Sequence, residues 1–372
     1  MDPLVTTIFL CGDVMTGRGI DQALPHPSEP GLFEPFVTDA RVYVDLAESA
    51  FGPFQKPLGF AEVWGDALAE LNRAAPDVRV INLETAVTGS NDYWKGKGIN
   101  YRMNPANAAV LSVAGIDVAA LANNHVLDWG YPGLAETLET LSNQKIGYAG
   151  AGRNRMEAEA PAIVGLGRKG RVVVFSLASE TSGVPEAWAA KEDRPGVNFL
   201  RDLSDDTVRR VRDQVQGVKK PGDIVIASIH WGPNWGYDIS AGQVRFSRGL
   251  IDLAGVDVIH GHSSHHALAI EVYRGKLILY GCGDFLNDYE GISGHEAFRG
   301  DLGLMYFAQV DPQTGRLVSL DMTPTQVRHF RVNRAPAVDA AWLAGVLSRE
   351  GQSRGTRVVV TDDDRLRLEW KE

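Results

Sequence analysis

The feature that most constrains the fold is a set of apolar, β-branched runs that each end in a polar side chain. Such runs predict buried strands, and ligands in α/β folds usually bind at the carboxyl ends of strands. If these strands share one sheet, the side chains that follow them converge at one edge. The polar residues, in chain order, are Asp13, Glu84, Asn124 with His125, His230, and His262 with His265.

The densest part of this pattern is the stretch 260–266, which follows the apolar run 256–259. It contains His260, His262, His265 and His266, four of the nine histidines in the chain. Imidazole is the commonest protein ligand for a transition metal. A cluster this dense after a buried strand is hard to explain by packing, so we expect a ligand site here.

The combined residues form a mixed oxygen and nitrogen donor set without cysteine thiolates. That set suits Mn, Fe, Zn, Ni, Co or Mg rather than a structural zinc. Taken singly, each residue has an ordinary structural explanation as a helix cap, a salt-bridge partner, a turn residue or a core histidine. The joint pattern instead predicts a divalent-metal centre with one or two ions.

The order of the predicted elements indicates the fold class. The first two-thirds of the 372 residues alternates strand and helix, and the last third is richer in strands and hairpins. This order favours an α/β protein with a mixed sheet or two facing sheets. The chain is long for one core, but no linker interrupts it, so one large domain is compatible with the sequence.

Composition and charge exclude several classes of partner. The formal net charge is −10 and no basic run is present, which argues against nucleic acid or an anionic membrane surface as a partner. The N-terminus lacks the basic region of a signal peptide, and no apolar run is long enough to span a bilayer. The two cysteines, Cys11 and Cys282, are too few for a disulfide framework. We therefore expect a cytoplasmic protein with reduced thiols.

Five short segments identify a resemblance to a known family. They resemble the capsule-synthesis or poly-γ-glutamate-synthesis family, which belongs to the calcineurin-like metallophosphoesterase superfamily, and the match runs from about residue 7 to 310. The segments are Gly12-Asp13-Val14-Met15, Asn82-Leu83-Glu84-Thr85, Asn123-Asn124-His125, His230-Trp231-Gly232 and Gly261-His262-Ser263-Ser264-His265.

The resemblance implies a fold and a set of residue roles. It implies a four-layer α-β-β-α sandwich with a metal site at the strand ends, formed by a catalytic domain over residues 1–330 with a C-terminal helix and hairpin, 331–372, packed on it. It also implies metal ligation and acid catalysis by particular residues. In these roles Asp13 and His265 hold a first metal, Glu84 bridges, Asn124, His230 and His262 hold a second metal, and His125 acts as a general acid.

Three departures from the superfamily pattern bear on the chemistry. Met15 occupies the position of a usual histidine, Glu84 replaces a shorter aspartate, and two residues rather than one separate His262 from His265. The first metal site has therefore lost a ligand in this interpretation. A two-metal clamp for in-line phosphoryl transfer becomes less secure.

Some members of this family resemble peptide epimerases, for example the lasso-peptide epimerase that acts on a C-terminal tryptophan. That resemblance implies a metal that holds the carboxyl group of a ribosomal precursor peptide, and an acid and a base on opposite faces of the Cα atom. The candidate acid–base groups are His295, Cys11 and His125, and the candidate substrate-binding residues are Trp231, Trp235, Asp284 and Arg18. Simpler explanations exist: a small buried cysteine, an exposed loop histidine and loop packing of the aromatic side chains.

The preferred hypothesis from sequence is therefore a divalent-metal-dependent peptide epimerase that inverts an L centre to D. The second is a hydrolase at the same site, either a phosphoesterase or a peptide or amide hydrolase. The third is a non-catalytic accessory protein of capsule-polymer synthesis. The expected partner is a peptide or a small polymer.

Overall fold

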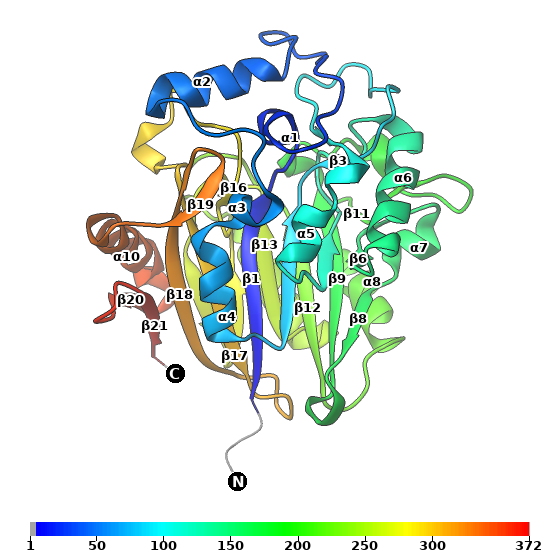
Figure 1. Ribbon diagram of the computed structural model, residues 1–372. Helices are drawn as coiled ribbons and strands as arrows, with labels where there is room; N and C mark the ends of the chain where they lie inside the picture. Colours follow the sequence, from blue (N-terminus) through cyan, green and yellow to red (C-terminus); the bar gives the residue numbers. More distant parts are fainter. Residues whose placement is uncertain (1–4, 372) are drawn as a thin grey trace.

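The computed structural model describes residues 5–371 of the chain. Residues 1–4 and 372, the outer ends of the predicted ranges 1–330 and 331–372, lie outside the described residues. Within residues 5–371, two large β-sheets and two short strand pairs are connected by helices (Figure 1).

The larger sheet has ten strands in the described part of the chain, in the order β20-β21-β18-β17-β1-β2-β5-β6, with β16 beside β1 and β19 beside β18. Strand β1 is parallel to β2 and β16 and antiparallel to β17. The strands are β1 (Thr6–Val14), β2 (Val78–Leu83), β5 (Val118–Ala120), β6 (Gly147–Ala149), β16 (Asp284–Leu286), β17 (Leu302–Val310), β18 (Leu317–Arg328), β19 (Arg331–Arg334), β20 (Thr356–Val360) and β21 (Leu366–Trp370).

The smaller sheet has seven strands among residues 5–371, in the order β11-β9-β12-β13-β15-β14, with β8 beside β9. They are β8 (Ala162–Gly165), β9 (Arg171–Ser179), β11 (Phe199–Leu200), β12 (Asp223–His230), β13 (Val258–His262), β14 (Ile270–Tyr273) and β15 (Lys276–Leu279). The short pairs are β3 (Ala86–Val87) with β4 (Arg102–Met103), and β7 (Ala151–Gly152) with β10 (Gly196–Val197).

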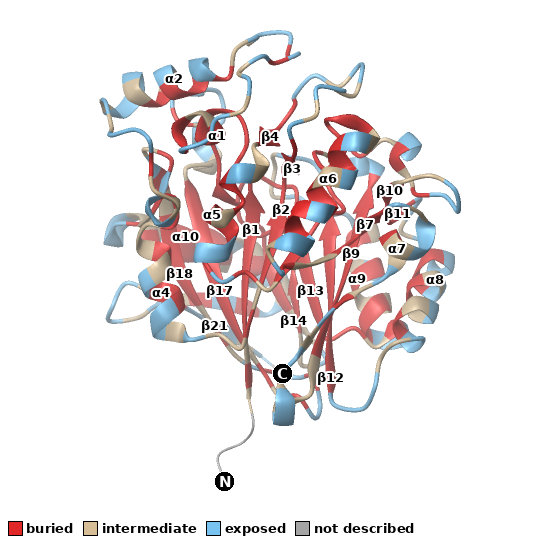
Figure 2. Cartoon of the chain, turned by 45° about the vertical axis from the view of Figure 1, so that its right-hand side comes forward, coloured by how far each residue is buried: buried red, intermediate tan, exposed pale blue. Residues whose placement is uncertain are grey.

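The apolar residues divide into clusters on either side of each sheet. Alternate residues of β1 point to opposite faces, as strand geometry requires: Leu10 packs between the two sheets with Ile226 of β12, and Phe9 packs on the outer face of the larger sheet. In Figure 2 the strands are almost wholly buried, and the helices around them have exposed outer surfaces. The mixed α/β fold expected from the sequence is confirmed.

Helices pack on the outer faces of both sheets. The outer cluster of the larger sheet takes side chains from α3, α4, α5 and α6, and that of the smaller sheet takes them from α8 and α9. The helices are α1 (Gly19–Ala23), α2 (Arg41–Phe51), α3 (Phe60–Trp64), α4 (Asp66–Ala74), α5 (Ala109–Val113), α6 (Gly130–Asn143), α7 (Arg155–Glu159), α8 (Asp205–Gln216), α9 (Ala241–Gly249) and α10 (Ala337–Gly351).

Helix α8 shows how the sequence sets these elements. The Ser204 hydroxyl accepts a hydrogen bond from the Thr207 amide and caps the helix, as its residue type predicts. Val208, Val211 and Val215 then follow at helical spacing and are buried against the smaller sheet.

The C-terminal segment is continuous with the larger sheet. Strands β19 and β21 both pair with β18, and α10 contributes Leu343 and Leu347 to the cluster between the sheets. The described part of the predicted extension 331–372 therefore packs on the same body as the rest, and a boundary at residue 330 stays a prediction.

The parallel strands bring the predicted strand ends together. Strands β1, β2 and β5 are neighbours in the larger sheet, and β12 and β13 are neighbours in the smaller one. The His260 imidazole contacts the Cys11 carbonyl oxygen at 2.7 Å, which ties β13 to β1 across the two sheets. The polar residues that follow these strands consequently lie between the sheets at one end of the fold.

Candidate metal centre

Two Cys-Gly-Asp segments lie side by side at the centre of the site. Strands β1 and β16 are parallel, with Asp13 opposite Asp284, and the Asp13 amide donates to the Gly283 carbonyl at 3.0 Å. A Cβ atom on Gly12 would lie 1.6 Å from the Gly283 oxygen, so only glycine permits this approach. The close contact places two buried carboxylates next to each other.

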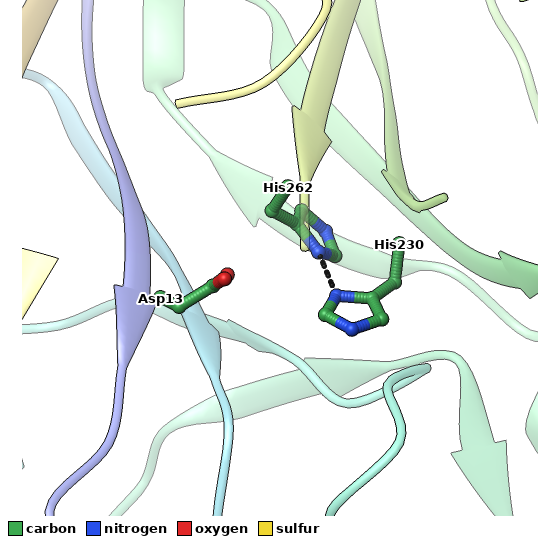
Figure 3. A group of neighbouring side chains, drawn as sticks. All are labelled: Asp13, His230 and His262. Carbon is green, nitrogen blue, oxygen red and sulfur yellow. Dashed lines mark hydrogen bonds between the residues drawn. The ribbon is translucent and has the colours of Figure 1, made fainter. Parts of the chain in front are cut away.

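Asp13 belongs to two overlapping groups of potential metal ligands. One group is Asp13 with His230 and His262, and the other is Asp13 with His265 and Asp284; within each group the ligand atoms lie within 4.8 Å of one another, and all five residues are buried. Figure 3 shows Asp13 on β1 facing the two imidazoles across the gap between the sheets. Asp13 is therefore common to both groups, whereas Glu84, the bridging residue that the resemblance implies, belongs to neither, and its role stays a prediction.

His230 and His262 form a close pair because β12 and β13 are parallel and in register at these residues. Their Nδ1 atoms are 2.8 Å apart (Figure 3), and the Asn124 Oδ1 atom is 3.1 Å from His230 Nε2. Burial, followed by neighbouring histidines, holds the pKa of both rings well below the ordinary value. Both imidazoles are thus neutral at physiological pH, the form that ligates metals.

Glu84 lies on the opposite side of Asp13 from the strand β16. The Asn82 side-chain amide donates to Asp13 Oδ1 at 2.7 Å and to Glu84 Oε2 at 3.0 Å. Glu84 Oε1 is 3.9 Å from His230 Nε2. Burial and the nearby Asp13 raise the pKa of Glu84 well above its usual range, as expected for a carboxyl group held next to another without a cation.

The donor set fits a divalent cation. Burial and the neighbouring Asp284 raise the pKa of Asp13 to about 7. Burial alone would lower the pKa of His265, but Asp284, whose Oδ1 is 2.8 Å from its Nδ1, raises it above the ordinary value. Three buried carboxylates beside neutral imidazoles lack sufficient positive charge, and a divalent ion would neutralise them. Mixed oxygen and nitrogen ligands leave the identity of the metal open.

His125 is held beside this cluster by a hydrogen-bond network. Its Nδ1 atom is 2.6 Å from Asp128 Oδ2 and 2.9 Å from Lys97 Nζ, and Lys97 also donates to Asp128. The Nε2 atom of His125 faces Glu84 Oε1 at 3.7 Å. Burial, then Lys97, lowers the pKa of His125 to about 4. No motif or periodicity pointed to Lys97, which lies in the irregular segment 88–101.

On the other side, Trp235 connects the cluster to a cavity of about 270 Å³. Its ring stacks on His295, with centroids 4.1 Å apart, and packs against His265 at 5.3 Å. The cavity is lined by Trp235, His295 and Asn287, and Asn287 donates to Asp284 at 2.7 Å. This cavity therefore borders the side of the cluster formed by His265 and Asp284.

Three predicted site residues lie away from the ligand cluster. Arg18 is buried between Glu34 (3.2 Å) and Asp288 (2.6 Å). Cys11 packs in the outer cluster of the larger sheet, and burial raises the pKa of its thiol well above the usual range. Trp231 is buried under α9. None of the three presents a free group at the ligands in this structure, so their roles in catalysis or substrate binding stay predictions.

Asp284 offers a candidate ligand for the first metal site, in which Met15 replaces the usual histidine. Met15 is buried, and its Sδ atom accepts a hydrogen bond from the Tyr289 hydroxyl at 3.8 Å. Asp284, which we expected to bind substrate, lies among the potential ligands with Asp13 and His265. The repeated Cys-Gly-Asp segment was the sequence signal for this candidate ligand, and the expected role of Asp284 in substrate binding stays a prediction.

Comparison with known proteins supports the resemblance noted above. Residues 7–289 match the family described as bacterial capsule synthesis protein PGA_cap. This match covers most of the chain, including every residue of the two ligand groups. The chain belongs to this family.

Several relatives with assigned names are similar over much of the chain. A probable polyglutamine synthesis accessory protein of Mycobacterium tuberculosis is 48% identical over 368 residues, which cover 99% of this chain and 97% of the relative. The PGA biosynthesis protein CapA of Bacillus subtilis is 32% identical over 58% of this chain and 54% of its own length. The capsule biosynthesis protein CapA of Bacillus anthracis is 29% identical over 76% of this chain and 60% of its own length.

The structure also bears on the expectation that no segment spans a membrane. Across residues 5–371, no helix combines the length and the apolar character required to cross a membrane. The cytoplasmic location expected from the sequence stays a prediction.

Proposed function

We propose that this chain is a divalent-metal-dependent accessory protein in the synthesis of a poly-γ-glutamate-type capsule polymer. The observation that carries the proposal is the position of Asp13, common to two buried groups of ligands. The names of the relatives support the biological context. The proposal includes the four-layer arrangement and the strand-end metal site of the calcineurin-like superfamily.

Each part of the cluster has a role in this proposal. Asp13 and Asp284 supply oxygen ligands, His230 and His262 supply neutral nitrogen ligands, and Asn82 orients the carboxylates. A divalent ion bound there supplies Lewis acidity toward a carbonyl or phosphoryl oxygen. Proton transfer is assigned to the hydrogen-bond network of His125, Asp128 and Lys97.

His125, whose pKa is lowered to about 4, is the neutral group best placed to accept a proton beside the ligands. Asp128 and Lys97 fix its Nδ1 side, so its Nε2 atom is directed at Glu84. A histidine oriented in this way serves as a general acid or base when a substrate lies against the cluster. This arrangement supports the hydrolase hypothesis, in which the bond cleaved is a phosphate-ester, peptide or amide bond.

The test combines metal content with polymer yield. Asp13→Asn and His262→Gln each remove one ligand, and Asp223→Asn, a buried aspartate paired with Arg171 at the opposite end of β12, is the matched control. After loading with manganese, we expect elemental analysis to find bound metal in the wild type and the control, and little in the two ligand variants. In a polymer-producing bacterium, the same variants should lose polymer. Full polymer yield with Asp13→Asn would reject the metal-dependent role.

Peptide epimerisation is the second candidate, favoured by imidazoles on both flanks of the cluster. His125 lies beside Glu84, and His295 stacks on Trp235 beside His265. Inversion at a Cα atom needs an acid and a base on opposite faces of that atom. Incubation of candidate peptides with the metal-loaded protein in deuterium oxide tests it: uptake of one deuterium at Cα supports epimerisation, and hydrolysis without uptake excludes it.

A further inference from the structure

A second cleft lies at the edge of the smaller sheet, away from the metal centre. Its volume is about 400 Å³, and it is enclosed by α7, the strand segment β10–β11 and the beginning of α8. Figure 1 shows α7, α8 and β11 together on one side of the molecule. None of the residues that line it belongs to the two ligand groups.

Three arginines line this cleft. Arg155 and Arg201 are exposed, and within residues 5–371 neither side chain has a hydrogen bond or an ion pair. Arg210 pairs with Glu159 at 3.2 Å and donates to the Phe199 carbonyl at 2.9 Å. Burial lowers the pKa of Arg210, and repulsion by Arg155 and Arg201 lowers it further, whereas the pair with Glu159 opposes the shift. The guanidinium groups are therefore close enough to repel one another.

The acidic residues of the cleft are already engaged. Asp202 accepts hydrogen bonds from the Ser204 hydroxyl at 2.5 Å and from the Thr207 hydroxyl at 2.6 Å. Asp206 pairs with Arg209. Glu159 is paired to Arg210, and Asp202 keeps its negative charge but uses its Oδ1 atom for these hydroxyls, so the cations of the cleft without an ion pair among the described residues are Arg155 and Arg201. Planar guanidinium groups bind carboxylates through paired hydrogen bonds.

Asn198 adds a second kind of unpaired group to the cleft wall. Its residue is 2% exposed, and neither the nitrogen nor the oxygen of its side-chain amide has a partner among the described residues. Its backbone is fixed, because its amide donates to the Gly150 carbonyl at 2.8 Å. A buried amide with both a free donor and a free acceptor is unfavourable, and another amide is one group that satisfies both at once.

We propose that this cleft binds an acidic peptide or isopeptide chain. Carboxylates of the chain pair with Arg155 and Arg201, and one of its backbone amides pairs with the side chain of Asn198. The identity of this chain as the capsule polymer rests on the proposed function. The cleft then holds a stretch of polymer outside the metal centre. The segment that carries Ser182 connects the cleft to that centre, because the Ser182 hydroxyl donates to the His230 carbonyl at 2.9 Å.

The first experiment measures binding of a fluorescent decamer of γ-linked glutamate to the full chain by anisotropy. We expect binding of this decamer and none of a γ-linked glutamine decamer, which lacks the carboxylates. The double variant Arg155→Gln/Arg201→Gln should weaken binding roughly 10-fold, because each exposed charge pair contributes a few-fold. The matched control, Arg168→Gln/Arg357→Gln, makes the same charge change at exposed residues outside the cleft and should leave binding nearly unchanged.

Two further arms identify the ligand chemistry. An α-linked glutamate decamer distinguishes an ordinary acidic peptide from the isopeptide polymer, and either one binding with the arginine dependence supports the proposal. Inorganic phosphate is the second arm, and a strong, arginine-dependent phosphate affinity without peptide binding overturns it. Asn198→Leu, which removes the unpaired amide at similar size, should keep the fold and weaken decamer binding; unchanged binding overturns the role of Asn198.

The test also separates this proposal from the proposed function. Decamer binding is measured with a chelator present and in the Asp13→Asn variant, and we expect it to persist in both. If binding is lost with Asp13→Asn and insensitive to the arginine pair, the decamer occupies the metal centre and the cleft proposal is overturned. If the arginine-dependent binding persists while Asp13→Asn supports full polymer yield, the proposed metal role fails and the cleft stands.

Discussion

Replacing Asp13 by asparagine should stabilise the metal-free protein and destabilise the metal-loaded one. Burial and Asp284 raise the pKa of Asp13 from 3.8 to about 7. The folded pKa is above the unfolded one, so this group's contribution to stability is complete below about pH 4 and is lost as the pH rises to about 7. A difference of about 3 pKa units corresponds to roughly 4 kcal/mol lost at pH 8 in the absence of metal.

The substitution removes that penalty but also loses a contact. The Ser263 amide donates to Asp13 Oδ2 at 3.2 Å, and loss of this hydrogen bond costs about 1 kcal/mol. The asparagine oxygen can still accept from Asn82, which now donates to Asp13 Oδ1. The net expectation for Asp13→Asn at pH 8 without metal is therefore a gain of about 3 kcal/mol in the free energy of unfolding, falling toward zero or below at pH 4 to 5.

The free energy of unfolding of both proteins is measured by urea titration, with tryptophan fluorescence as the signal. The titrations are made with a chelator at pH 5 and pH 8, and then with manganese at pH 8. Manganese should stabilise the wild type increasingly as its free concentration exceeds the dissociation constant, and Asp13→Asn much less, so the order of stabilities reverses at a few hundred times that constant or more. The control is Asp223→Asn. Arg171 lowers the pKa of Asp223 in spite of burial, so loss of the Asp223 carboxylate should destabilise the folded protein at pH 8. A metal-free Asp13→Asn protein that is less stable than the wild type at pH 8 would refute the reasoning.

Two further substitutions test other parts of the site. Arg18→Met should lower the free energy of unfolding by about 3 to 5 kcal/mol in urea, because it leaves Glu34 and Asp288 buried without their cation; an unchanged midpoint would contradict this role for the ion pairs. Gly12→Ala should prevent β1 from lying against β16, since its Cβ would stand 1.6 Å from the Gly283 oxygen, and should yield insoluble or metal-free protein; a soluble variant that loads manganese normally would contradict it.

The sequence predicted the strand ends well because the signal is local. An apolar run followed by Asp13, His230 or His262 marks both the strand and a candidate ligand, and parallel pairing then brings those ends together. Asp284 was assigned to substrate instead, because its place among the ligands depends on β16 pairing with β1, a contact between distant parts of the chain.

The direction in which a side chain points also limited the prediction of site residues from the sequence. Trp231 follows a predicted strand end as His230 does, yet it is buried against Phe246 under α9, and its ring nitrogen donates to the Tyr280 carbonyl at 2.9 Å. Adjacent residues of a strand point to opposite faces, so one of the two had to turn away from the site. Lys97 lies in an irregular segment, and no periodicity there could place it beside His125.

The pairing of β1 with β16 makes completion of the group Asp13, His265 and Asp284 a late event in the synthesis of the chain. Asp13 comes from near the start of the sequence and Asp284 from its last third, so a nascent chain still on the ribosome exposes the first carboxylate long before the second exists. Contacts between such distant segments form slowly, and a site that needs both is complete only when the chain has closed on itself. A chain cut short before residue 284 would keep Asp13, His230 and His262 but lack Asp284, so the two groups of candidate ligands are completed one after the other.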